Sequence, residues 1–173
     1  RLVPAPDLVE VDAVDVAASA EEAWERVRHG DLGDSGPIRA LFALRALPDR
    51  LRGGSADLAL RLDDLAPTPE RPGFGILSDD PPREVAVGAI GEVWRRSIPF
   101  VHVGDAVAFA AFDAPGQVKV AWAIRVIPAD GGGSTVCMEV RAAATDPASL
   151  RRFRRYFRLI GPGSRLVRRT LLG

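Results

Sequence analysis

The sequence contains a single cysteine, Cys137, and only two histidines, His29 and His102. One cysteine excludes a disulfide framework and a cysteine-rich metal site. The two histidines lie far apart in the sequence, so a metal site could be assembled only by combining them with carboxylates. We therefore predict neither a bound metal nor a cofactor.

Long apolar runs are also absent. No stretch approaches the roughly 18 consecutive apolar residues that indicate a membrane span, so none is predicted. The N-terminus shows no basic region followed by an apolar core, which is the pattern of a signal peptide. A cytoplasmic location is therefore expected, although the chain opens on Arg1 and residues can precede it.

Net charge is zero, but charge is unevenly distributed along the chain. Residues 1–80 hold 9 arginines and 16 acidic residues, for a net charge of −7, whereas residues 81–173 hold 14 basic and 7 acidic residues, for +7. A basic half is one indication of nucleic-acid binding. No basic-aromatic ribonucleoprotein motif or helix-turn-helix pattern accompanies it, so we predict no nucleic-acid partner.

The chain is long enough for one domain with a sizeable core, and we assign residues 1–173 to a single domain. Alternation predicts a first strand over residues 9–17, with Val14 and Val16 following a change of parity. Two short helices are predicted next, over residues 19–30 and 38–47. Residues 49–72 carry a weak, proline-rich signal and are interpreted as a flap.

The pattern of the second half of the chain predicts strands joined by short turns. Because strands joined by such short turns run antiparallel, we expect an antiparallel sheet. Asp146 then begins a long helix over residues 147–160, with Phe153 and Phe157 on its apolar face and arginines on the others. We predict an α+β fold in which an antiparallel sheet curves around this C-terminal helix. The five strands of this half are predicted over residues 74–78, 83–94, 106–112, 117–127 and 134–145.

This order of elements resembles the helix-grip fold of the START-like (SRPBCC) superfamily, which includes polyketide cyclases, lipid-transfer domains and pollen-allergen-like proteins. Residues 88–94, 138–141 and 153–164 are similar to bacterial members of that superfamily. In their pattern threonines flank the glutamate. This chain has Met138 and Val140 beside Glu139, so those two hydroxyls are missing.

Small residues occupy many central strand positions, which favours an elongated apolar cavity between the sheet and the C-terminal helix, gated by residues 49–72. His102 is placed at its rim, as the one histidine positioned to act as a general base. The alternative is that the large side chains simply fill a solid core. The predicted lining residues are Trp94, Phe109, Val120, Trp122, Met138, Phe153 and Phe157.

Glu139 and Arg141 fall on the opposite parity and are interpreted as a solvated network in which Glu139 pairs with Lys119 or Arg125. Such exposed pairs are common, so this interpretation is favoured over a catalytic dyad. No serine or cysteine is visibly paired with a base. No catalytic residue is predicted.

Three functions remain open. The favoured one is binding or carrying a small hydrophobic molecule in the cavity. The second, suggested by the resemblance, is a polyketide aromatase/cyclase-like enzyme. The third is a protein-interaction domain with a filled core, whose partner would meet the arginines of residues 151–158. The sequence leaves the ligand and the oligomeric state undetermined.

Overall fold

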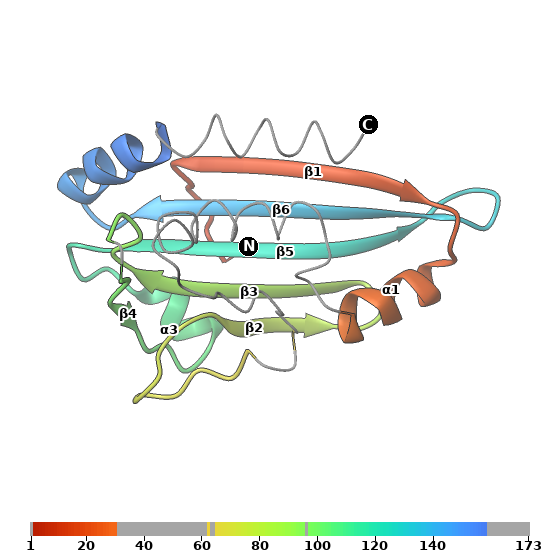
Figure 1. The fold of residues 1–173 in the computed structure, drawn as a ribbon, viewed down its shortest axis with the longest axis horizontal. Coiled ribbons are helices and arrows are strands. Elements are labelled where there is room, and N and C mark those ends of the chain that lie inside the picture. Colours follow the sequence, from red (N-terminus) through yellow and green to blue (C-terminus); the bar gives the residue numbers. More distant parts are fainter. Residues whose placement is uncertain (1, 31–61, 63–64, 96, 159–173) are drawn as a thin grey trace, which may run out of the picture.

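A computed structural model of the chain describes residues 2–30, 62, 65–95 and 97–158. The described residues form a curved antiparallel sheet with the order β1-β6-β5-β3-β2, and β4 pairs with β3 (Figure 1). None of the helices in these ranges has the length and apolar character needed to cross a membrane. The strands are β1 (Leu8–Val16), β2 (Gly75–Asp80), β3 (Glu84–Gly91), β4 (Phe100–Val101), β5 (Val118–Pro128) and β6 (Ser134–Ala144).

Within the described ranges, three helical segments accompany the sheet: α1 (Ala20–His29), α3 (Ala106–Ala111) and a C-terminal helix over residues 147–158. The predicted fold class is confirmed, because β1 and α1 are followed by the other strands of one antiparallel sheet and then by a C-terminal helix. The predicted helix over residues 38–47 and the last two residues of the predicted C-terminal helix lie outside the described residues. So does most of the 49–72 segment.

The strand register divides the sheet into two faces. The inner face is the one on which Val87, Trp122 and Val140 lie opposite one another across β3, β5 and β6. The outer face is the one on which Ala86, Ala123 and Glu139 lie opposite one another across the same strands. Side chains alternate between these faces along each strand, so consecutive residues point to opposite faces of the sheet.

Helix α1 covers one end of the inner face. Its N-terminus has the predicted capping box: the Glu22 amide donates to Ser19 Oγ at 3.2 Å, and the Ser19 amide donates to Glu22 Oε2 at 3.1 Å. Trp24 is buried on this helix and packs in one cluster with Trp122 and with Leu62, the latter from the segment predicted as a flap. This end of the inner face is therefore a closed apolar core.

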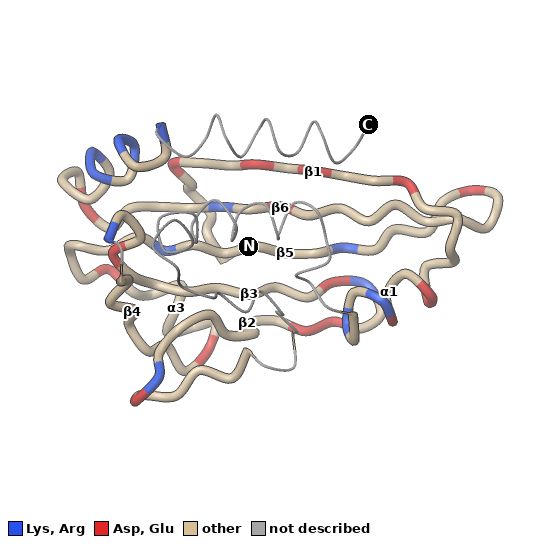
Figure 2. Tube along the Cα trace, in the orientation of Figure 1, with Lys and Arg blue, Asp and Glu red and all other residues tan. Residues whose placement is uncertain are grey.

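The C-terminal helix begins at the other end of the sheet (Figure 1). Asp146 accepts hydrogen bonds from the Ser149 hydroxyl at 2.5 Å and from the Gly116 amide at 2.7 Å, and these contacts hold the pKa of its carboxyl well below the usual range. Phe153 is buried in a cluster with Val118, whereas Phe157 is only half-buried. The arginines of this helix are exposed, as predicted (Figure 2).

One predicted strand is wrong: residues 106–111 form helix α3, and β5 pairs directly with β3 where the predicted strand was expected. Four of the six helical residues are alanine, the strongest helix former. The Asp105 side chain caps the helix by accepting from the Ala108 amide at 2.7 Å. Of the two large side chains, Phe109 is fully buried and Val107 is exposed.

The predicted change of parity in β1 is also wrong. The strand pairs with β6 in one continuous register from Leu8 to Val16. Val9 and Val11 consequently lie on the outer face and are exposed, whereas Glu10 and Asp12 lie on the inner face. β1 is an edge strand of the sheet.

Candidate functional site

The structure places three of the predicted lining residues in the middle of the inner face. Val120, Trp122 and Met138 all belong to the inner rows of β5 and β6. Trp122 is buried, but Val120 and Met138 are only half-buried. Val140, which pairs directly with Trp122, is half-buried as well.

Three more predicted residues gather at the end of the inner face that the C-terminal helix covers. Trp94, Phe153 and Phe157 belong to the same apolar cluster as Val120. The Phe153 and Phe157 rings are 5.9 Å apart between centroids, and the guanidinium of Arg152 lies 5.8 Å from the Trp94 ring. Six of the seven predicted lining residues therefore follow the inner face from one end to the other.

The structure does not bring Phe109 to the inner face. Phe109 comes from α3 and lies on the outer face, where its ring is so close to Gly88 that a Cβ there would stand 3.0 Å from it. Lys119, another outer-face residue, lies over the same ring at 5.8 Å. The prediction failed because it treated residues 106–112 as a strand of the sheet, whereas residues 106–111 form helix α3.

His102 is also separate from the inner face. It is exposed, and it lines a small pocket of about 290 Å³ beside β2 together with Leu77 and Gly88. Gly88 is an outer-face residue of β3. His102 therefore lines a pocket beside β2 and not the predicted cavity of the inner face.

Sequence reasoning missed two acidic residues of the inner face. The register of β1 sets Glu10 opposite Val140 and Asp12 opposite Met138, and both acidic residues are half-buried. Their alternation with Val9 and Val11 gave no sign of this, because the valines are the more apolar row. Only the pairing of β1 with β6 shows which row points inward.

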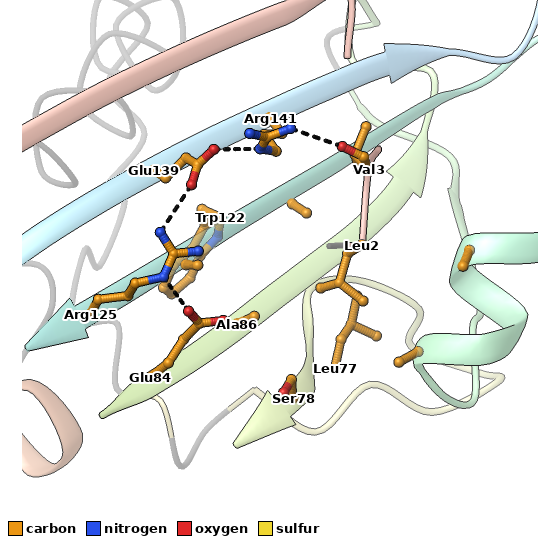
Figure 3. Close-up of a pocket in the computed structure, with 14 residues that line it drawn as sticks. Leu2, Val3, Leu77, Ser78, Glu84, Ala86, Trp122, Arg125, Glu139 and Arg141 are labelled. Carbon is orange, nitrogen blue, oxygen red and sulfur yellow. Dashed lines mark hydrogen bonds and ion pairs between the residues drawn. The ribbon is translucent and has the colours of Figure 1, made fainter. Parts of the chain in front are cut away.

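The outer face carries a pocket of about 480 Å³, shown in Figure 3. Its floor is made of small side chains, because Ala86, Ala121 and Ala123 lie together on β3 and β5. The further lining residues come from the N-terminal segment, β2, α3 and the strands: Leu2, Val3, Leu77, Ser78, Glu84, Ala106, Ala110, Trp122, Arg125, Glu139 and Arg141. We call it the outer pocket.

One side of the outer pocket is a chain of ion pairs, the outer-face network of Glu84, Arg125, Glu139 and Arg141 (Figure 3). Arg125 donates to Glu84 through Nε and to Glu139 through Nη1, the latter at 3.1 Å. Arg141 donates to the other oxygen of Glu139. Its Nη1 also donates to the Val3 carbonyl at 3.2 Å, which ties the N-terminal segment to the sheet.

The predicted pairing of Glu139 with Arg125 is confirmed, but the prediction that this network is solvated is wrong at one end. The side chains of Glu139 and Arg141 are only 10% and 14% exposed, because the N-terminal segment lies against them. Lys119 takes no part and instead donates to the carbonyls of Ala110 and Phe112.

Two members of the network, Glu139 and Arg125, are stabilised in their charged forms. Burial alone would raise the pKa of Glu139, but hydrogen bonds from Arg141 and Arg125 outweigh burial and bring its pKa below the usual value. The hydrogen bond to Glu84 in turn raises the pKa of Arg125. A carboxylate with a lowered pKa is a poor proton donor or acceptor near neutral pH, so Glu139 is suited to holding structure and not to acid–base catalysis.

Comparison with known proteins gives only distant matches. No protein-family model matches the chain, and no curated protein does. Among solved structures, CalU16 from Micromonospora echinospora is 15% identical over 99% of this chain and 77% of its own, with a TM-score of 0.37. Truncated norcoclaurine synthase from Thalictrum flavum is 14% identical over 90% and 81%, with a TM-score of 0.39. DR_A0006 from Deinococcus radiodurans is 18% identical over 88% and 95%, with a TM-score of 0.36. At this distance no residue, ligand or activity is transferred from them.

Proposed function

We propose that the protein binds or carries a small hydrophobic molecule against the middle of the inner face, around Val120, Trp122 and Met138. The observation that carries this proposal is the incomplete burial of Val120, Met138 and Val140. These residues belong to β5 and β6, which are paired on both sides, so their exposure is not that of a sheet edge. At the α1 end of the same face, Val85 on β3 is fully buried.

Covering an apolar surface of this kind with a ligand lowers the free energy of the system. Removing it from water is worth about 25 cal/mol for each square ångström. The centre of the inner face offers aliphatic carbon from Val120 and Val140 and the thioether of Met138, beside the buried Trp122, and none of these four side chains is titratable. Such a lining recognises a ligand by its shape and apolar area, which suits binding or transport better than bond-making chemistry.

Glu10 and Asp12 support the alternative of a polyketide cyclase-like enzyme. They lie beside the proposed site, across from Val140 and Met138, and carboxylates are able to move protons at a bound polyketone. Binding of an apolar molecule is common to both functions. Turnover that is lost in Glu10→Gln or Asp12→Asn, with binding retained, would favour the enzyme.

The binding prediction is tested by a pair of variants on one strand. A fluorescent anilinonaphthalene dye should bind the native protein at a single site with micromolar affinity. Val120→Trp places an indole on the inner face and should weaken binding at least about tenfold, or about 1.4 kcal/mol. Ala123→Trp adds the same side chain to the outer face of β5 and should leave the dye affinity unchanged.

Circular dichroism of both variants controls for folding. The proposal is rejected if the native protein binds no dye. It is also rejected if the folded Val120→Trp variant binds as tightly as the native protein. A filled core and a protein-interaction function would then be the better account.

A further inference from the structure

We propose that the outer pocket is a second binding site, independent of the inner face, for a small molecule without net charge. This ligand would have an apolar body and a polar end that both donates and accepts hydrogen bonds. The pocket provides a hollow of suitable size, an apolar wall and a polar wall that presents both charges.

The hollow arises from the small side chains of its floor. Ala86 and Ala123 are direct partners across β3 and β5, and Ala121 follows Ala123 on the same face. Larger side chains stand around them, from the N-terminal segment, β2 and the network (Figure 3). A volume of about 480 Å³ lies within the range of about 300–1,000 Å³ that is usual for small-molecule sites.

The apolar wall comes from three separate parts of the chain. Leu2 and Val3 belong to the N-terminal segment, Leu77 to β2, and Ala106 and Ala110 to α3. The Arg141 hydrogen bond to the Val3 carbonyl fixes the first of these parts beside the network. An apolar body such as a phenyl ring would contact carbon on these sides of the pocket.

The polar wall offers hydrogen bonds at its open end. The side chains of Glu84 and Arg125 are 33% and 34% exposed, against 10% for Glu139. Within the described part of the chain, Glu84 accepts through Oε2 and Arg125 donates through Nε and Nη1. The second oxygen of Glu84 and the second terminal nitrogen of Arg125 are the atoms that would meet a ligand.

The charges of the network select against an ionic ligand. Its two carboxylates and two guanidinium groups balance, and each is already paired with an opposite charge. An added anion would compete with Glu84 for Arg125, and an added cation would compete with Arg125 for Glu84. Either would leave a charge without its partner in a half-buried site, which is unfavourable. An amide-like end satisfies both groups and disturbs neither pair.

Three probes with similar aromatic bodies test this selectivity: phenylacetamide, which is neutral, phenylacetate, an anion, and phenethylamine, a cation. Isothermal titration or NMR titration of the full chain at neutral pH should show the tightest binding for phenylacetamide. We expect at least about a tenfold preference over each ion. Equal or tighter binding of either ion, or no binding of phenylacetamide at millimolar concentration, would overturn the proposal.

Two variants locate the site. Ala123→Leu fills the floor of the outer pocket. Ala110→Leu narrows the pocket from α3, and because Ala110 is exposed, this position tolerates a larger side chain more easily than Ala123 does. Both should weaken phenylacetamide binding at least about tenfold. Val120→Trp, on the inner face, should leave it unchanged. Retained binding in both leucine variants, or loss in Val120→Trp with its fold intact, would show that the probe binds elsewhere.

Discussion

Replacing Glu139 with alanine is expected to destabilise the fold by about 3–5 kcal/mol, the range for removing one partner of a buried ion pair. Glu139 accepts from both Arg125 and Arg141, and Arg141 is itself almost buried. The variant would leave the guanidinium of Arg141 without its carboxylate beneath the N-terminal segment. The free energy of unfolding from urea denaturation at neutral pH measures this loss.

Glu84→Ala is the matched control for Glu139→Ala. It also removes one carboxylate from Arg125, but Glu84 is more exposed, so its loss should cost no more than about 1 kcal/mol. Adding Arg141→Met to Glu139→Ala should restore part of the lost stability, because the uncompensated charge is then absent. Similar losses for Glu139→Ala and Glu84→Ala would contradict the burial described for the network.

Phe153→Ala should lower the free energy of unfolding by about 3–5 kcal/mol, the usual cost of deleting a buried aromatic ring. Phe153 is the buried aromatic residue that packs the C-terminal helix against Val93, Val118 and Ala142. Phe157→Ala should cost clearly less, because its ring is half-buried although it belongs to the same apolar stripe. Denaturation midpoints of the two variants decide the order, and a reversed order would mean that the buried aromatic residue is misassigned.

The central strands could be predicted from the sequence because their signals are local. β5 and β6 show strict alternation, and the glycines between them adopt the positive φ angles of a tight hairpin, at 96° for Gly131 and 95° for Gly132. The same alternation identified Val120, Trp122 and Met138 as one face. For β5 and β6, which have neighbouring strands on both sides, the local pattern was sufficient to predict both the strand and the face to which each side chain points.

The errors arose where a distant contact decides the structure. Helix α3 is a short alanine-rich segment with one buried side chain, Phe109. The Phe109 ring packs close to Gly88, which has no side chain of its own. The burial of Glu139 and Arg141 depends on the Val3 carbonyl, 138 residues away from Arg141 in the sequence. The orientation of β1 depends on its pairing with β6, because both of its rows are compatible with an edge strand. None of these contacts leaves a periodic signal in its own segment.

The two faces of the sheet thus have different characters. The inner face is apolar and incompletely covered at its centre, and the outer face holds a neutral network beside an alanine-floored pocket. Met138 and Cys137 are consecutive residues of β6 that point to opposite faces, Met138 inward and Cys137 outward. They are also the single methionine and the single cysteine of the chain, so each can carry its own label.

The most direct test of binding on the inner face is therefore an NMR titration with methionine methyl groups labelled with carbon-13 and Cys137 carrying a trifluoromethyl tag. The Met138 signal is assigned by its loss in Met138→Leu. Addition of a fatty acid or the anilinonaphthalene dye should shift the Met138 signal until it saturates, while the Cys137 signal stays in place. An unchanged Met138 signal at saturating probe, or a shift confined to Cys137, would contradict binding at the inner face.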